Sequence, residues 1–497
     1  MKRVFVVGAL AACNSSGVSV APVVDVPVND TASGFPVDSI TLSAAHNGSL
    51  IDIASATFTK GQAVDLAGIP FGDDLVIHMV GRVGTGEFSY GRTCAFTFTQ
   101  NATPPEPHLY FSRTAKFGAL GFTPLLRYAG AAVPYHDGSG ILVGGVSSAS
   151  DPTSAVTDVE RFDPTMNDYR PLTSISARLG GVIALLGTGT ETLVMVIGGT
   201  DPTGAPLTFV ETIEAENPAD RRVERIDDTT MARVGLSATT LTDGTVVVIG
   251  GSGAGSGSGC GPANDPSACV ETIGLANGTP TTRPAHGTLL HGRWNHTATR
   301  LSNDAGAPVL VAGGIGTGNG SGSAHPIAEA ELYNPVTDQF ASSFNYSMVI
   351  PRSQHQAVRL LDGSVVIIGG VDAGGQPVRQ LEVFTPYAGF SAPTGVVLPA
   401  TSGVVGFTAT SLPDGRVLLT GGSSAPGGPP VDTAVILQPN TDTGGIDILP
   451  TDHLTVARTG HSATLLCDGT VLISGGTTIP TGPQPAERYN PSSAGRR

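Results

Sequence analysis

Three histidines share one spacing in this sequence, and they are its strongest candidates for chemistry. Each follows an arginine by three residues. Imidazole nitrogens bind metal ions and transfer protons near neutral pH, so three of them from separate segments could in principle meet at one metal ion. Recurrence at one place in a repeated segment is, however, what a structural role predicts, with each side chain bonding to a neighbouring strand. The pairs are Arg293 and His296, Arg352 and His355, and Arg458 and His461.

Six glutamates recur in the same way, at a second fixed position. Paired carboxylates can serve as general acid and base, but a carboxylate that returns in each repeat is expected to bond to backbone amides or to an arginine. We therefore predict no catalytic residue and no metal ligand in either set. The glutamates are Glu160, Glu211, Glu271, Glu331, Glu382 and Glu487.

The elements that must position these side chains are short strands that end in a pair of glycines. A Gly-Gly doublet follows an apolar run seven times. Several runs begin after Asp-Gly, as at Asp362-Gly363, and this dipeptide favours a tight hairpin because the turn needs positive φ. Each repeat therefore predicts four antiparallel strands, and stacking such units in a ring buries the faces that one unit would expose. The doublets are Gly144-Gly145, Gly198-Gly199, Gly250-Gly251, Gly313-Gly314, Gly369-Gly370, Gly421-Gly422 and Gly475-Gly476.

With these motifs the sequence resembles the kelch repeat family. The fifth repeat carries Arg352-Ser-Gln-His355, then Leu361-Asp-Gly-Ser-Val-Val-Ile-Ile-Gly-Gly370 and Glu382-Val-Phe-Thr-Pro386. The seventh repeat carries the same motifs, ending in Glu487-Arg-Tyr-Asn-Pro491. The resemblance implies an all-β fold, with a seven-bladed kelch-type β-propeller over residues 109–497.

The residues before the repeats predict a separate small domain. Residues 31–105 lack the doublet and show short alternating strands, which favour a β-sandwich of the immunoglobulin-like kind. Residues 101–107, rich in proline, would separate it from the ring. The last repeat has no segment of its own for a fourth strand, so we predict that residues 110–117 complete it. Such a strand would join both ends of the ring and cover an exposed sheet edge.

The amino-terminal sequence predicts a location outside the cytoplasm. Leu10-Ala11-Ala12-Cys13 follows a basic start and an apolar run, and it resembles the lipobox of bacterial lipoprotein signal peptides. The resemblance implies a signal peptide at residues 1–12, lipidation of Cys13 and a tether over residues 13–30. We therefore expect an extracytoplasmic protein of the bacterial cell envelope, at the outer membrane or cell surface, whose only membrane contact is the lipid.

Cysteine placement agrees with an oxidising compartment. Cys260 and Cys269 lie in one loop rich in glycine and serine, and we expect them to form a disulfide. Cys94 and Cys467 are either a second disulfide or two separate buried thiols, and the sequence leaves both alternatives open. The spacing of the cysteines matches no zinc-binding pattern.

Charge and composition exclude one class of partner. The formal net charge is −15, so no basic cluster is available to bind the phosphates of a nucleic acid. Charged residues make up only 13% of the chain, whereas it has 67 glycines and 37 prolines, which favours turn-rich β structure over helix.

The sequence favours recognition over catalysis. Galactose oxidase and the sialic-acid epimerases are similar propellers, but Tyr135-His136, which resembles a tyrosine-histidine pair, abuts a predicted hairpin turn. The glycine-rich stretch 251–261 lacks the Gly-Lys-Ser/Thr ending of a phosphate-binding loop. We expect no cofactor, and we predict a non-enzymatic binding or scaffold module that uses the long loops 251–269 and 314–326 to bind a protein or glycan. The alternative is a kelch-type carbohydrate-active enzyme of the oxidase or epimerase class.

Overall fold

Strands joined by turns make up the part of the chain that the computed structural model describes. These residues contain no α-helix, and none of their helical turns has the length and apolar character to span a membrane. The described residues are 3–4, 18–20, 22–27, 36–59, 62, 64, 66–100, 105–120, 124–148, 150–216, 222–227, 232–253, 267–285, 287–317, 323–341, 346–440, 445–479 and 484–493.

Seven antiparallel sheets follow one another through the described residues after the N-terminal unit, and we number them sheets 1 to 7. In each, the strands pair in the order first, second, third, fourth. Sheet 1 contains β13 (Ala131–Pro134), β14 (Gly140–Val143), β15 (Asp158–Asp163) and β16 (Asp168–Ser174); sheet 2 contains β17 (Val182–Leu186), β18 (Leu193–Ile197), β19 (Phe209–Ile213) and β20 (Val223–Asp227); sheet 3 contains β21 (Ser237–Thr240), β22 (Val246–Ile249), β23 (Val270–Ala276) and β24 (Thr279–Pro284).

The remaining four sheets repeat this plan. Sheet 4 contains β26 (Thr297–Arg300), β27 (Val309–Ala312), β30 (Glu329–Asn334) and β31 (Gln339–Phe340), with β32 (Tyr346–Ser347) also on β30; sheet 5 contains β33 (Gln356–Arg359), β34 (Val365–Ile368), β35 (Glu382–Thr385) and β36 (Gly389–Ser391); sheet 6 contains β37 (Thr408–Ser411), β38 (Val417–Thr420), β39 (Ala434–Asn440) and β40 (Gly445–Pro450); sheet 7 contains β42 (Ser462–Leu465), β43 (Val471–Ser474), β45 (Glu487–Asn490) and β12 (Lys116–Ala119).

The second strand of each sheet is buried along nearly all of its length. All four residues of β22 and of β34 are 0% exposed. A strand covered on both faces carries a continuous apolar run instead of an alternating one, and this is why these strands read as Val-Val-Val-Ile and Val-Val-Ile-Ile. The apolar contacts of each second strand with the next sheet form the core.

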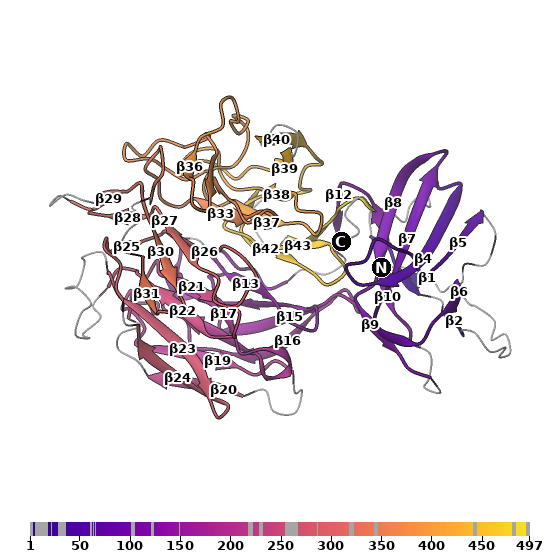
Figure 1. Cartoon of the computed structure of the whole chain (residues 1–497), viewed down its shortest axis with the longest axis horizontal. Helices are drawn as coiled ribbons and strands as arrows, with labels where there is room; N and C mark the ends of the chain where they lie inside the picture. The colour runs from indigo at the N-terminus through magenta and orange to yellow at the C-terminus, as the bar shows by residue number, and fades with distance from the viewer. Residues whose placement is uncertain are drawn as a thin grey trace.

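The first strands contact one another in chain order and return to the start. The neighbours are β13 with β17, β17 with β21, β21 with β26, β26 with β33, β33 with β37, β37 with β42, and β42 with β13. The sheets therefore follow a closed circuit, visible in Figure 1 as the magenta and orange sheets and the yellow last sheet.

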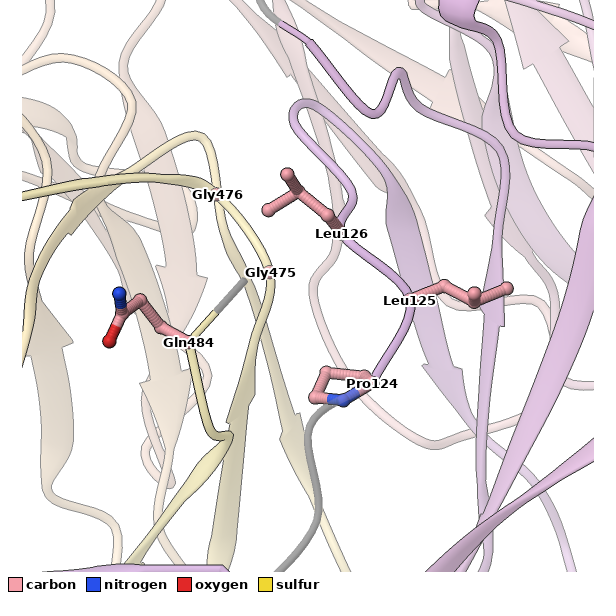
Figure 2. Close-up of a pocket in the computed structure, with 6 residues that line it drawn as sticks. All are labelled: Pro124, Leu125, Leu126, Gly475, Gly476 and Gln484. Atoms are coloured by element: carbon pink, nitrogen blue, oxygen red, sulfur yellow. The ribbon is translucent and has the colours of Figure 1, made fainter. Parts of the chain in front are cut away.

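Sheet 7 uses strands from both ends of the repeat region. Its fourth strand, β12, pairs antiparallel with β45, with Phe117 opposite Tyr489. The predicted closing segment 110–117 is therefore divided: only its last two residues lie in β12, and the rest belongs to the N-terminal unit. Figure 2 shows the adjoining seam, where residues 124–126 run beside Gly475 and Gly476.

The two faces of this ring carry different connections between strands. We use the word crossover for the segment that runs from each fourth strand to the next first strand. The edge of the ring that carries the Gly-Gly doublets and the crossovers is called the doublet face. The opposite edge carries the turns between first and second strands and between third and fourth strands, and we call it the turn face. Two small sheets extend the doublet edge, namely β25 (Arg293–Trp294) with β28 (Ile315–Gly316) and β29 (His325–Pro326), and β41 (Ala457–Thr459) with β44 (Thr477–Ile479).

The N-terminal unit is built from three further sheets around one apolar core. The largest joins β5 (Ala54–Thr59), β4 (Ser39–His46), β7 (Gly72–Val83), β8 (Gly86–Arg92) and β11 (Ser112–Arg113), with β9 (Phe96–Phe98) on β7; another joins β1 (Arg3–Val4), β3 (Val23–Asp25) and β10 (His108–Tyr110); the third pairs β2 (Val18–Val20) with β6 (Leu66–Ile69).

Two boundaries in this region differ from the sequence-based expectation. Within the predicted tether 13–30, Val20 and Val24 are buried in the core of the unit, because β2 and β3 pair with strands far along the chain. The unit also continues beyond residues 101–107, since β10 and β11 belong to its sheets. The ring begins only at β12.

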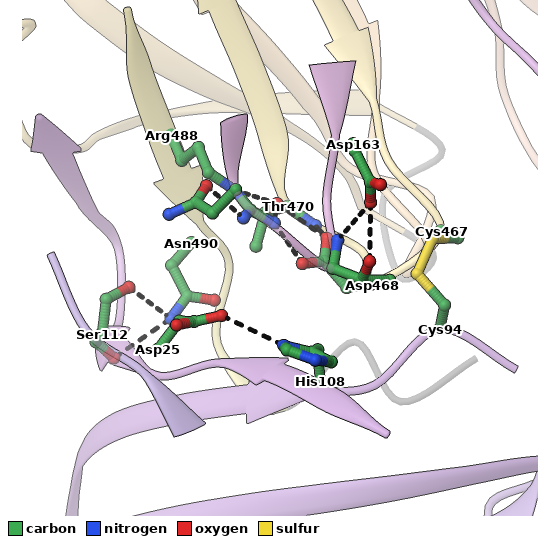
Figure 3. Close-up of polar contacts among 12 residues, drawn as sticks. Asp25, Cys94, His108, Ser112, Asp163, Cys467, Asp468, Thr470, Arg488 and Asn490 are labelled. Atoms are coloured by element: carbon green, nitrogen blue, oxygen red, sulfur yellow. Dashed lines mark hydrogen bonds and ion pairs between the residues drawn. A yellow bond between two sulfur atoms is a disulfide. The ribbon is translucent and has the colours of Figure 1, made fainter. Parts of the chain in front are cut away.

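The N-terminal unit is held to sheet 7 by a buried polar cluster (Figure 3). The Arg488 guanidinium pairs with Asp468 and lies over the ring of Tyr110, 4.0 Å from its centre. Asn490 donates from Nδ2 to the Ser112 carbonyl at 3.0 Å and to the Tyr90 carbonyl at 2.6 Å. One strand of the ring, β45, thus satisfies backbone groups of the unit.

A disulfide between Cys94 and Cys467 reinforces this attachment. Their Cα atoms lie 4.9 Å apart although 373 residues separate them in the sequence. Cys467 lies between β42 and β43, so the bond fixes the unit at the turn face. This resolves the alternative that the sequence left open, in favour of the disulfide.

We expect replacement of both Cys94 and Cys467 by serine to loosen the N-terminal unit. Loss of so long a covalent loop should lower its free energy of unfolding by about 2–4 kcal/mol. Hydrogen exchange measures this directly: amides of β7 and β8 should exchange faster, whereas those of β22 should not change. Unchanged protection of β7 and β8 would show that the disulfide contributes nothing to the attachment.

Candidate functional site

A buried arginine begins six of the seven repeats and forms an ion pair with a glutamate on the third strand of its own sheet. Each arginine also donates to the carbonyl of the first glycine of that sheet's doublet. We call this arrangement the Arg–Glu–Gly hub. The pairs are Arg127 with Glu160, Arg178 with Glu211, Arg233 with Glu271, Arg293 with Glu331, Arg352 with Glu382 and Arg458 with Glu487.

The hub of sheet 5 shows the geometry. Arg352 Nη2 lies 2.5 Å from Glu382 Oε1, and Nη1 donates to the Gly369 carbonyl at 3.2 Å. Both side chains are 0% exposed. The carboxylate also accepts the backbone N–H groups of Val349 at 2.6 Å and Ile350 at 3.0 Å. Burial lowers the pKa of the Arg352 guanidinium, and Glu382 opposes that shift.

Sequence reasoning found only the three hub arginines that precede a histidine. It missed Arg127, Arg178 and Arg233. A usable signal was present, because the hub arginine precedes its doublet by 17 residues in four sheets and by 20 in two. Spacing to the doublet would therefore have identified all six.

Sheet 6 carries two valines in place of the ion pair. The Val404 carbonyl accepts the N–H of Gly370, as the Arg352 carbonyl accepts that of Gly314. Val435 lies opposite Leu419, as Glu382 lies opposite Ile367. Both valines are buried in one apolar cluster. The arginine and the glutamate are thus replaced together, which avoids leaving one buried charge unpaired.

The three histidines lie between neighbouring sheets. His355 Nε2 is 3.0 Å from Thr297 Oγ1 on the first strand of the preceding sheet. Its ring covers the first glycine of the preceding doublet, where a Cβ on Gly313 would come within 2.8 Å of Cε1. His296 and His461 make the equivalent contacts with Ser237 and Thr408.

The sheets without histidine use the same place differently. Leu236 covers Gly198 and Phe407 covers Gly369, whereas sheets 1 and 2 have Gly130 and Gly181 there. A residue at this position therefore fills the joint between two sheets.

Burial lowers the pKa of His355 to about 3, and Arg352 adds to the shift. The pKa of His461 is lowered to about 3 by burial and by Arg458. The pKa of His296 is lowered well below its usual value for the same two kinds of reason. All three rings are neutral near pH 7.

Tyr135 and His136 each bond to a different protein group. Tyr135 Oη donates to the Thr192 carbonyl at 2.8 Å, and burial raises the pKa of Tyr135 to about 12. His136 Nε2 lies 2.6 Å from Glu216 Oε1. The nearby Cys467 Sγ is bonded to Cys94.

The described part of the chain holds no group of three His, Cys, Asp or Glu side chains arranged to bind a metal ion. The recurring arginines and glutamates bond within their own sheet, and the three histidines bond to the preceding sheet.

The doublet face exposes aliphatic side chains along its crossovers. Leu290 is 68% exposed, Val349 62%, Val397 46% and Leu125 41%. Hub glutamates hold three of these residues by their backbone, accepting the N–H groups of Leu125, Leu290 and Val349. A shallow pocket lies at the same edge, at the seam between sheets 7 and 1 (Figure 2); it is lined by Pro124, Leu125, Leu126, Gly475, Gly476 and Gln484.

Several predicted residues fall outside the described part of the chain. These are Cys13, Cys260 and the middle of both long loops. Cys269 is disulfide-bonded, and its bridge to Cys260, which lies outside the described residues, stays a prediction.

We expect Glu382→Val to destabilise the protein by about 3–5 kcal/mol, because it leaves the buried Arg352 without its counter-charge. The double variant Arg352→Val, Glu382→Val, which copies sheet 6, should recover most of that loss. Urea denaturation of the native protein, both single variants and the double variant gives the coupling free energy. Additive losses in the double variant would contradict the hub.

We expect stability to fall on acidification through these histidines. An unfolded histidine binds its proton near pH 6.5, at about its ordinary pKa, whereas His355 in the fold does so only at about 3. Between these values the unfolded chain binds more protons, so stability rises with pH. The variant His355→Phe copies Phe407 of sheet 6. Between pH 7 and about 4.5 its Tm should fall less than the Tm of the native protein. Parallel Tm curves for the two proteins would refute this.

Comparison with known proteins identifies the fold. No family model matches this chain, and no curated protein matches it. Among solved structures, a fungal alcohol oxidase of the AA5 family, determined in complex with copper, matches with a TM-score of 0.54 and 14% sequence identity, over 76% of this chain and 77% of that one. At this identity the likeness concerns the fold alone: the all-β, galactose oxidase-like and kelch-like fold predicted from the repeats is confirmed.

Proposed function

We propose that this chain is a seven-bladed kelch-type β-propeller with a β-sandwich-like N-terminal unit, and that it is a non-enzymatic binding module for a protein ligand. Each of sheets 1 to 7 would be one blade. This count is supported by the contacts of the first strands, which return from the last sheet to the first, and by the pairing of β12 with β45 in sheet 7. The match to the copper-bound alcohol oxidase supports the fold class.

The observation that carries the proposal is the row of exposed aliphatic side chains on the doublet face. Leu290, Val349 and Val397 occupy three consecutive crossovers, from sheet 3 to sheet 6, and each is at least 46% exposed. Exposed apolar surface that a rigid scaffold presents is typical of protein interfaces. Aliphatic groups suit a protein partner better than a glycan, which aromatic rings bind by stacking.

The orientation of the chain supports the same face. The N-terminal unit is attached at the turn face of sheet 7. If Cys13 carries a lipid, as its lipobox-like context suggests, the anchor lies on the side of that unit, and the doublet face is directed away from it. We therefore propose a lipid-anchored protein of the bacterial envelope that binds its partner with the doublet face.

The alternative is a copper-dependent oxidase, and it is supported by the fold similarity only. The two functions separate in one assay. The protein is incubated with one equivalent of Cu(II), desalted, and assayed for retained copper and for oxidation of galactose and of a primary alcohol. Retained copper with turnover would establish the oxidase and overturn the binding module.

We expect the double variant Leu290→Asp, Val349→Asp to abolish partner binding without unfolding the protein. Charges at these exposed sites remove the apolar contact and cost little stability. The measurement is capture of a partner from the envelope fraction of the native cell, its identification by mass spectrometry, and titration of the purified partner by surface plasmon resonance.

Leu361→Asp is the matched control for this pair. Leu361 is 65% exposed but lies on the turn face, between β33 and β34. Binding that survives in the double variant, or that is lost equally with Leu361→Asp, would contradict the doublet face as the site.

A further inference from the structure

Two arginines occupy the same register position on neighbouring first strands. Arg300 ends β26 and Arg359 ends β33, opposite Val309 and Val365 of the second strands. The strands β26 and β33 contact each other, and both residues lie at the turn face. The other sheets carry only uncharged residues at this position, namely Pro134, Leu185, Thr240, Ser411 and Leu465.

The two guanidinium groups share one neutral acceptor. Arg300 Nη2 donates to Asn303 Oδ1 at 3.1 Å, and Arg359 Nη2 donates to the same oxygen at 2.8 Å. Arg300 Nη1 donates to the Thr240 carbonyl at 3.0 Å. Each guanidinium is a rigid fork of several N–H donors, so most donors of both remain available for another acceptor.

Across the described ranges, neither arginine has a carboxylate oxygen within the 4.0 Å of an ion pair. The nearest turns do carry acids, but these bond locally: Asp304 accepts from Ser302 Oγ, and Asp362 accepts from Ser364 N and Oγ. The hub arginines of the same sheets, by contrast, are each neutralised by a glutamate.

The pair is therefore a local concentration of positive charge in a chain of net charge −15. Like charges held this close repel each other. Partial burial lowers the pKa of Arg300, and the charge of Arg359 lowers it further. Both arginines are half-buried and Asn303 is exposed, so the donors are accessible from solvent.

We propose that Arg300, Arg359 and Asn303 bind an oxyanion, of the carboxylate or phosphate class, at the turn-face end of the inner strands. Two guanidinium forks from adjacent strands match an anion with two or more oxygens. The amide nitrogen of Asn303 adds a neutral donor. The site lies on the face opposite the apolar crossovers, so it stands independently of the proposed partner interface.

Titration calorimetry of the full chain tests this, with inorganic phosphate and with acetate as separate probes at low ionic strength, where charge pairing is least screened. We expect saturable binding of at least one probe at a single site. Arg300→Gln and Arg359→Gln should each weaken it by about ten-fold or more, because each removes one charged fork. Arg222→Gln removes an exposed, paired arginine elsewhere and should leave the affinity unchanged.

A second readout keeps the test independent of ligand choice. Without anion and at low salt, Arg359→Gln should keep or raise the Tm, because it relieves the repulsion; an arginine with a purely structural role would lower it. Tighter binding of phosphate assigns a phosphate-bearing ligand, and tighter binding of acetate a carboxylate. The proposal fails if neither probe binds, or if the Arg300→Gln, Arg359→Gln double variant binds as the native protein does.

Discussion

The Arg–Glu–Gly hub is the interaction on which the rest of the ring depends. Each arginine connects the doublet at the end of the second strand to the third strand, and five of the glutamates also bind a backbone N–H of the incoming crossover. Three segments of a repeat thus meet at one buried ion pair. Removing either charge from water is costly, and the ion pair and its hydrogen bonds offset that cost. In sheet 6 two buried valines fill the place of the ion pair with apolar contacts.

The hub also fixes the backbone of the crossovers on the doublet face. The glutamates that satisfy the buried arginines fix the backbone N–H groups of Leu125, Leu290 and Val349. The buried glutamates therefore hold the backbone of the side chains that a partner would contact. Loop chemistry at the doublet face can change while this backbone support stays the same, which suits a scaffold for recognition.

The repeat architecture could be predicted from sequence because its constraints are local. The first glycine of every doublet has a positive φ, which other residues rarely adopt, so this glycine recurs in every repeat. At Gly313 a histidine ring also leaves no room for a Cβ atom. Contacts between distant segments could not be predicted. Val20 and Val24 lack any local signal that they pair with strands around residues 66–69 and 108–110. Half of the hub arginines could not be found from the histidines, because a histidine occupies the joint between sheets in only three repeats.

The sharing of sheet 7 between β12 and β45 has a consequence for how the chain reaches this structure. Sheets 1 to 6 can each form soon after synthesis, but the seventh waits for strands that more than 360 residues of chain separate. Closure of the ring is thus a contact of very high sequence separation, which slows folding. Until then the outer strands of an open ring offer unpaired edges to other chains. Cys94 likewise meets its partner Cys467 only after the last repeat has been made.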